Sequence, residues 1–302
     1  MTENCAISHH PAPKDHDHKH DRGYGRVRVA LGLAVSLIII QGLGSWLSGS
    51  LALLADTVHV LSDALSLAVA WGAGILAVRP QSHKRSYGYY RLEVLAALVN
   101  GTALLIVAAL ILRESYARWS NPSPLLAGTM FWFALFGLVL NLWMLFTLHP
   151  AQSSNLNIKG AYLHVLGDAL SSVVVLVSSI IIYFFNIYWL DPLAGGFVAL
   201  MIAFMSIRLV YQSVHILLEG TPLHLNSTEV QTSLRSQFRE IQNIHDFHIW
   251  QITSDLVALT AHIEASITSL DEQRQLTEEI NAYLSSQYQI GHSTLQIEVA
   301  KK

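Results

Sequence analysis

Two apolar segments of the chain carry the same short pattern of ionisable residues. Residues 59–66 read HVLSDALS and residues 164–171 read HVLGDALS, so seven of the eight positions are identical. Each copy places a histidine four positions before an aspartate, which puts both side chains on one face of a helix. Each helix would therefore offer one imidazole nitrogen and one carboxylate oxygen. The four residues are His59, Asp63, His164 and Asp168.

Two such helices facing each other can bind a divalent metal ion. Two nitrogens and two oxygens form a donor set that zinc accepts in tetrahedral geometry. The alternative is hydrogen bonding between helices, which is the better explanation for a single intramembrane histidine. A mid-bilayer aspartate costs about 2.5–3.5 kcal/mol on insertion scales, so two matched pairs are hard to explain as packing. We therefore predict that these four residues form a transport site for the metal ion.

A third carboxylate lies one helical turn before the first pair. Asp56 precedes His59 by three positions and can share its face of the helix. We expect Asp56 to lie nearer the outer surface, where it lines the exit path or pairs with a hydroxyl group. Asn141 is a single amide in another apolar segment, and we expect it to hydrogen-bond between helices.

The helices that position these residues are expected to cross a membrane. The 302 residues are 52% hydrophobic and 13% charged, about half the charged fraction of a soluble protein. Spans need about 20 mainly apolar residues, and six segments qualify: Val27–Leu47, Leu51–Val78, Val94–Leu112, Leu125–Leu148, Gly160–Phe185 and Leu190–Tyr211. The repeated elements lie in the second and fifth, which cross in opposite directions, as inverted repeats around a substrate site do.

The lysine and arginine bias of the loops predicts the orientation of these spans. Basic residues crowd before the first span and between the second and third, and this side should be cytoplasmic. Six spans then leave both termini inside. Residues 1–25 form a polar segment with five histidines, which either binds metal loosely or is a solvated tail. The expected domains are this segment, the spans over residues 26–212, and a tail over residues 213–302.

The tail has the pattern of a small soluble domain. It is expected to hold helices over Thr228–Ile241 and Leu270–Tyr288 and strands over His245–Thr253, Val257–Ile267 and Ser293–Val299. The first helix has Ser227 or Thr228 as its expected cap. The order αββαβ suggests a ferredoxin-like sandwich. Strand alternation predicts His245 and Phe247 on one face of the sheet and Asp246 and His248 on the other.

Together these features resemble the cation diffusion facilitator family of metal/proton antiporters. The resemblance covers essentially the whole chain and rests on the paired histidine–aspartate elements, the six spans, the histidine-rich start and the acidic tail. Further matches are SGSLALLAD at residues 48–56, the Tyr87-Gly88 loop, LEG at residues 218–220 and HDFHIW at residues 245–250. The chain is most similar to the bacterial zinc-exporting branch, with a histidine and an aspartate on both helices.

This resemblance implies a function and an assembly. It implies a homodimer in the lipid bilayer of the bacterial inner membrane, which exports zinc to the periplasm in exchange for protons and has no nucleic-acid partner. It also implies an ion pair between the membrane part and the tail, at Arg91 and Glu219. Solvated loop charges are the alternative for that pair.

The resemblance further implies that the tail binds zinc as a regulatory ligand. The matching positions are His245, His262 and Glu298, and His248 and His292 are nearby candidates. The alternative is a set of surface histidines on a dimerising domain.

Three other functions fit the sequence less well. An intramembrane metalloenzyme needs an open coordination position and a general base, but four ligands close the site and no HExxH element is present. A metal-sensing receptor would need a signalling module, for which the tail leaves little room. A channel needs weak binding, which a cage of four ligands opposes. We therefore expect a transporter and no enzymatic activity.

Overall fold

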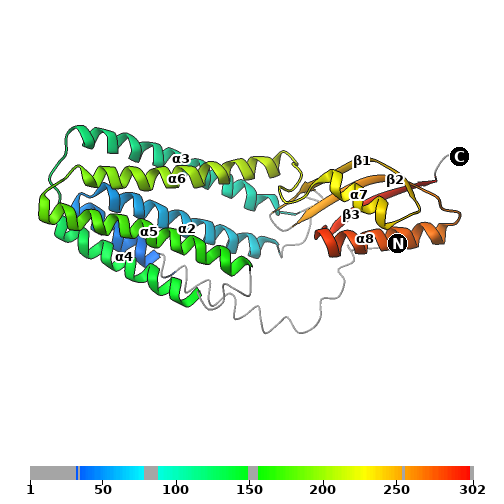
Figure 1. Cartoon of the computed structure of the whole chain (residues 1–302), viewed down its shortest axis with the longest axis horizontal. Helices are drawn as coiled ribbons and strands as arrows, with labels where there is room; N and C mark the ends of the chain where they lie inside the picture. Colours follow the sequence, from blue (N-terminus) through cyan, green and yellow to red (C-terminus); the bar gives the residue numbers. More distant parts are fainter. Residues whose placement is uncertain (1–31, 33–34, 78–87, 149–155, 254–255, 300–302) are drawn as a thin grey trace. The chain divides into compact units, whose positions relative to one another are not determined.

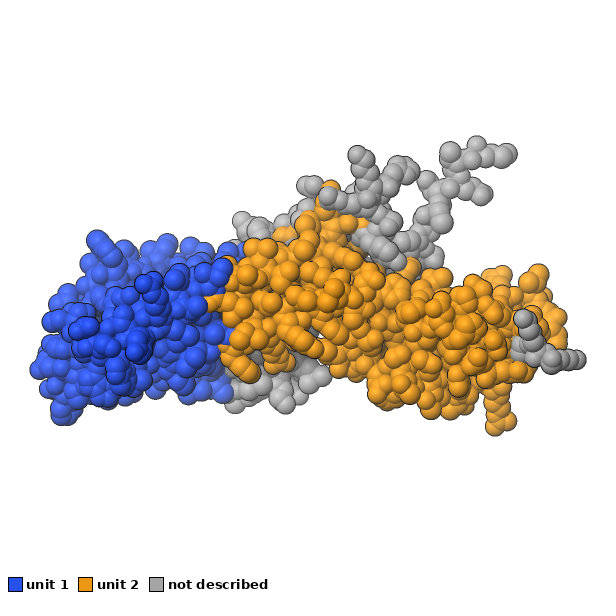
Figure 2. All heavy atoms as spheres, turned by 90° about the horizontal axis from the view of Figure 1, so that it is seen from above, with its two compact units in different colours: residues 1–71, 106–203 blue, residues 72–105, 204–302 orange. Residues whose placement is uncertain are grey.

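The structure of the protein is a computed structural model, which describes residue 32 and residues 35–77, 88–148, 156–253 and 256–299. At residues 66–67, 69–71, 73–77, 147–148 and 156–164 it describes the backbone alone. The histidine-rich segment over residues 1–25 lies outside the described residues. As far as they are described, residues 1–71 and 106–203 form one compact unit and residues 72–105 and 204–302 form another (Figure 2).

Long helices make up most of the described residues between 35 and 217 (Figure 1). They run over Val35–Ser48, Leu51–Ala77 (α2), Arg91–Ser120 (α3), Ala127–Leu148 (α4), Leu156–Phe185 (α5) and Leu190–Leu217 (α6). Within the described residues, α3 to α6 contain segments long and apolar enough to cross a membrane, and the Val35–Ser48 helix is shorter. The structure thus supports four of the six expected spans by length and composition, and it has a helix at both other positions.

These helices expose large apolar side chains, as lipid-facing helices do. Examples from five of them are Trp46, Ile106, Trp132, Phe184 and Phe204, each at least half exposed. Contiguous exposed apolar surface of this kind marks a membrane or partner interface in a protein. Several polar side chains of the first compact unit are buried instead, among them Asp56, His59 and Asp168, and they lie where α2 and α5 meet.

The start of α2 is held by a carboxylate from α6. Asp191 is buried and accepts hydrogen bonds from the Ser50 hydroxyl and from the backbone N–H groups of Leu51 (2.7 Å) and Ala52 (3.2 Å). The first N–H groups of a helix have no partner within it, and a negative charge is favourable there. Asp191 therefore caps α2 although it belongs to the first turn of α6, and it anchors the helix that carries His59 and Asp63.

The C-terminal domain has the element order α7 (Ser227–Gln237), β1 (Ile241–Gln251), β2 (Val257–Ala265), α8 (Leu270–Tyr288) and β3 (His292–Val299). The three strands form one sheet in the order β1-β2-β3, in which β1 and β2 are antiparallel and β2 and β3 are parallel. Both helices pack on the same face of this sheet, because Leu234 of α7 and Ile280 of α8 share one apolar core with Leu259 and Ile263 of β2.

The predicted boundaries of α8 agree with the structure, whereas those of α7 do not. Phe238 has an extended backbone, so α7 ends at Gln237, and Ile241 already opens β1. The cap prediction was also wrong, because the side chain that accepts the first N–H groups of α7 is that of Asn226. Asparagine is as good a cap as serine, and Asn226 stands directly before the two positions predicted as the cap.

The alternation predicted for β1 is wrong, because the strand contains a bulge. The pairing of β1 with β2 shifts register between His245 and His248, and Asp246 has a left-handed backbone with φ 49°. A bulge adds one unpaired residue and reverses the facing of the residues beyond it. Phe247 therefore packs against the helices, whereas His245 lies on the open face of the sheet.

Candidate metal sites

The structure brings part of the repeated element together between α2 and α5. His59 Nε2 lies 2.8 Å from Asp168 Oδ1, although the two residues are 109 positions apart. The same nitrogen lies 3.9 Å from Asp63 Oδ2, one helical turn further along α2. These three side chains offer ligand atoms within 4.8 Å of one another. They form a group that we call the membrane group.

The spacing of the membrane group suits one small metal ion. Zinc binds nitrogen and oxygen at about 2.0–2.2 Å, so two donors on a tetrahedral zinc lie roughly 3.3 Å apart. The observed separations of 2.8 and 3.9 Å lie on either side of that value. Shifts of about half an ångström would therefore place all three donors around one ion. His59 and Asp168 are buried, so water would compete weakly with them for the metal.

His164 belongs to the same helix as Asp168, and its side chain is not among those described. Its backbone lies in α5, four positions before Asp168. Positions four apart share a helix face. Its role as the fourth ligand stays a prediction.

Asp56 lies beside the membrane group, is buried, and accepts hydrogen bonds from two polar side chains. Gln41 Nε2 donates to Asp56 Oδ2 at 2.8 Å, and Ser171 Oγ donates to Asp56 Oδ1 at 2.8 Å. The pairing with a hydroxyl group is one of the two roles expected of Asp56. Sequence reasoning missed Gln41, although a lone amide within the apolar run of residues 27–47 was an available signal.

Asn141 makes the interhelical bond that was predicted for it. Its Nδ2 donates to the Ser172 hydroxyl of α5 at 3.1 Å, and both residues are buried. Asn141 therefore ties α4 to α5.

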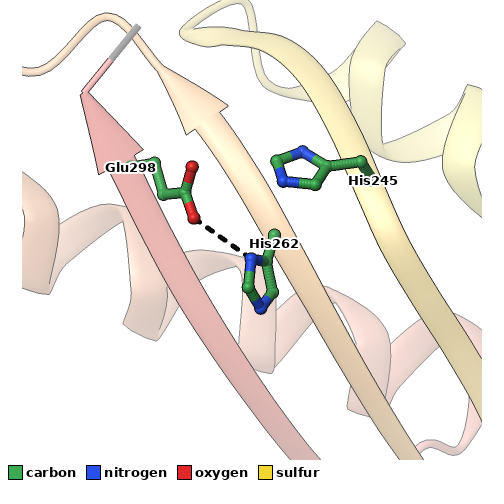
Figure 3. Close-up of side chains that lie close together, drawn as sticks. All are labelled: His245, His262 and Glu298. Carbon is green, nitrogen blue, oxygen red and sulfur yellow. Dashed lines mark hydrogen bonds and ion pairs between the residues drawn. The ribbon is translucent and has the colours of Figure 1, made fainter.

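A second group of potential ligands lies on the open face of the C-terminal sheet. His245 and His262 are directly opposite each other in the β1–β2 pair, and Glu298 comes from β3 (Figure 3). His262 Nδ1 lies 3.1 Å from Glu298 Oε1, and the two imidazole rings are 5.2 Å apart. The three residues offer ligand atoms within 4.8 Å of one another. We call these three residues the sheet group.

The other two histidines expected nearby differ in position. His248 Nε2 is 3.0 Å from Asp246 Oδ1, and the second oxygen of this carboxylate lies 3.8 Å from His262 Nε2. The bulge thus brings Asp246 and His248 to the edge of the sheet group. His292 pairs with Ala258, four residues before the β3 partner of His262, which is roughly 13 Å along the strand. His292 is therefore remote from the group.

Arg91 and Glu219 form an ion pair in the second compact unit. Arg91 Nη2 lies 3.0 Å from Glu219 Oε1, and both side chains are largely exposed. Arg91 begins α3, and Glu219 follows α6 with a left-handed backbone. An exposed pair of this kind contributes little to stability.

Comparison with known proteins covers both parts of the chain. A family profile described as the cation efflux transmembrane domain matches residues 27–218. A second, described as the cation efflux protein cytoplasmic domain, matches residues 222–300. The first profile contains both members of the histidine–aspartate repeat, and the second contains the sheet group.

Similar proteins are found in several bacteria. The chain is 38% identical to the cadmium, cobalt and zinc/H(+)-K(+) antiporter of Bacillus subtilis over 86% of this chain and 84% of that protein. It is 36% identical to the metal cation efflux system protein CzcD of Cupriavidus metallidurans, with 88% and 83% covered. It is 35% identical to the zinc transporter ZitB of Escherichia coli, with 86% and 83% covered. These relatives are transporters and not enzymes. Because both profiles match and the identity extends over most of the chain, the chain belongs to the cation efflux family, which is the cation diffusion facilitator family that its motifs resemble.

Proposed function

We propose that this protein exports zinc from the bacterial cytoplasm to the periplasm in exchange for protons. The observation that carries the proposal is the membrane group, in which His59 and Asp63 of α2 meet Asp168 of α5 inside a helical membrane domain. Three donors of the kinds that zinc prefers converge where the two copies of the repeat come together. His164 completes the site as the fourth ligand.

The proposal includes six membrane spans and a cytoplasmic tail. The Val35–Ser48 helix and α2 supply the two spans beyond α3 to α6. The lysine and arginine bias of the loops supports an orientation in which both termini lie on the cytoplasmic side of the bacterial inner membrane. The αββαβ tail is of the ferredoxin-like type and pairs with its copy in a homodimer, in keeping with the match to a cation efflux cytoplasmic domain.

Protons drive export by competing with zinc for the same atoms. Neutral imidazole and ionised carboxylate bind zinc, whereas their protonated forms do not. His59 already shares a hydrogen bond with Asp168, so one proton can remain between them when the metal leaves. Entry of protons from the more acidic outer side therefore releases zinc there, and loss of protons to the cytoplasm restores the site.

The donor set favours zinc over other divalent ions. Zinc is an ion of intermediate softness that binds nitrogen and oxygen ligands in tetrahedral geometry, and two nitrogens with two carboxylate oxygens match this preference. The names of two relatives extend to cadmium, cobalt or metal cations in general. We propose zinc as the main substrate, since the site contains no thiolate that would draw cadmium.

Zinc flux through the purified protein tests the proposed function. Full-length protein reconstituted into proteoliposomes should move zinc across the bilayer, at a rate that saturates with zinc concentration. Saturation is expected because each cycle loads one buried site, whereas a channel would give a rate that grows in proportion to concentration. Empty liposomes serve as the control. Zinc binding without any flux would identify a sensor or an enzyme instead.

The sheet group is proposed to bind zinc as a regulator. His245, His262 and Glu298 are each about one third exposed or more, so metal can exchange with the cytoplasm. Residues 213–302 hold eleven acidic and five basic residues. Bound zinc would lower the repulsion between two such tails and favour their approach, which links cytoplasmic zinc to transport by a shift of populations.

Replacing His262 should remove this regulation. In the full-length protein, H262A is expected to lower zinc affinity of the tail by about 10- to 100-fold, as loss of a metal-site residue does. H248A is the matched control, because His248 lies outside the group of three and bonds to Asp246. The distance between spin labels on the two tails should shorten with zinc in H248A but not in H262A. An equal zinc response in both variants would contradict the regulatory site.

The pair of Arg91 and Glu219 is proposed as a hinge between the spans and the tail. Its two residues come from the start of α3 and from the segment that follows α6. Because the pair is exposed, it can break and re-form at low cost while the tail moves.

A further inference from the structure

A buried polar cluster lies next to the membrane group, toward the Leu51 end of α2. It consists of Gln41 in the Val35–Ser48 helix, Asp56 in α2 and Ser171 in α5. We call it the Asp56 cluster. Each oxygen of the Asp56 carboxylate accepts one hydrogen bond, from Gln41 and from Ser171 respectively. None of the three residues is more than 3% exposed.

The Asp56 cluster joins four helices at one level. Gly137 of α4 lies against it so closely that a Cβ atom there would sit 2.5 Å from Gln41 Nε2. The Ser171 hydroxyl oxygen also lies 2.9 Å from the backbone oxygen of Asp168, so its single proton is shared between Asp56 and this second acceptor. The cluster is therefore linked to the metal-binding face of α5 and is packed closely against α4 at Gln41.

The exposed fraction of the acidic and histidine side chains of α2 differs between the two sides of the membrane group. Asp56 is 2% exposed, the His59 side chain is 10% exposed, and the Asp63 side chain is 32% exposed. Asp56 lies about 4.5 Å from His59 along the helix axis, on the closed side. Among these described residues, the membrane group is thus most exposed toward the Ala77 end of α2 and is enclosed by the Asp56 cluster toward the Leu51 end.

The chemistry of the Asp56 cluster suits a closure that can open. The carboxylate is held by two neutral donors from two other helices. Separating α2 from α5 or from the first helix breaks one bond and leaves an acceptor facing the new space. Interhelical bonds of this kind have two discrete arrangements, made and broken, which is what a switching element needs.

We propose that Gln41, Asp56 and Ser171 form the gate that closes one side of the transport site. This inference rests on the proposed function and adds the residues that control access from the Leu51 end. They are positioning residues, since they hold helices together and need not bind the metal. The gate opens when Asp56 releases Gln41 and Ser171, and zinc then leaves on that side.

Removing one donor should open the gate without disturbing the fold. S171A deletes the hydroxyl that bonds to Asp56. S179A is the matched control, because it is the same substitution at a buried position of α5 where the hydroxyl donates to the Leu176 backbone oxygen. Q41A removes the other donor and serves as an independent second variant.

Access is measured with a cysteine in the site. Full-length C5S protein with H59C is placed in vesicles of each orientation and treated with a membrane-impermeant thiol reagent. In the S179A background we expect fast reaction from the Ala77 side and slow reaction from the Leu51 side. S171A and Q41A should each raise the slow rate about ten-fold, through a shift toward the open arrangement.

Two results would overturn parts of the account separately. Equal slow rates in S171A, Q41A and S179A, with all proteins eluting as the wild type does in gel filtration, would overturn the gate. Zinc flux is measured in parallel on protein that retains His59. Absence of flux in that protein counts against the proposed function, whatever the labelling rates are.

Discussion

Replacing Asp168 with asparagine should abolish zinc transport while the protein stays folded. Asparagine has the size of aspartate, but its neutral amide is a weak zinc ligand and has one acceptor oxygen where the carboxylate at His59 has two. The site then loses one of its donors and one negative charge in a buried setting. Loss even of an outer-shell partner costs 10- to 100-fold, so we expect flux to fall by roughly 100-fold or more.

The D168N result is read against a matched substitution at the surface. D271N changes an exposed aspartate in the first turn of α8 and should transport zinc at nearly the wild-type rate. Gel filtration and thermal unfolding in detergent show whether each protein is folded. Near-normal flux in folded D168N would remove Asp168 from the transport site, and with it the reason for placing zinc between α2 and α5.

Zinc uptake into everted vesicles should depend strongly on an imposed pH gradient. The interior of such vesicles faces the side of the membrane that was periplasmic in the cell, and zinc must be released there. Protonated imidazole and protonated carboxyl groups do not bind zinc, so acid inside the vesicles favours release there. Proton concentration changes ten-fold for each pH unit, and we therefore expect collapse of a gradient of one pH unit to slow uptake by about ten-fold.

The pH-gradient experiment has to separate protons from other driving forces. Potassium is kept equal on both sides, because one relative is named as an antiporter of both H+ and K+. Valinomycin then holds the membrane potential near zero while the pH difference is varied. Uptake that is indifferent to the pH difference under these conditions would rule out proton exchange at this site.

The features that follow from local spacing could be predicted from the sequence. The four-residue spacing of His59 and Asp63 is sufficient to place both on one helix face, and the membrane group brings these two residues close to Asp168 of the second copy. The bounds of α8 were also predictable, since Ser269 is a good cap and the apolar positions recur at helical spacing.

The features that depend on tertiary partners were missed. Asp191 caps a helix whose start lies 140 residues earlier, and nothing near it in the chain shows this role. Gln41 is likewise explained only by its bond to Asp56. The alternation in β1 failed because Asp246 adopts a left-handed backbone, which an aspartate tolerates but does not require.

The bulge at Asp246 has a consequence for the sheet group. Without it, His245 and Phe247 would share a face, and either the histidine would be buried against the helices or the phenylalanine would be exposed. The bulge lets Phe247 join the apolar core while His245 stays opposite His262 on the open face. The proposed regulatory site therefore depends on one irregularity of backbone geometry.

The most direct measurement is the location of zinc in the full-length protein, by anomalous scattering at the zinc edge from crystals grown with saturating zinc. The account predicts a peak between α2 and α5, with two imidazole nitrogens and two carboxylate oxygens at about 2.0–2.2 Å, and loss of this peak in D168N. No peak between these helices in the wild type, or side chains of His59, Asp63, His164 and Asp168 that point away from one another around it, would contradict it.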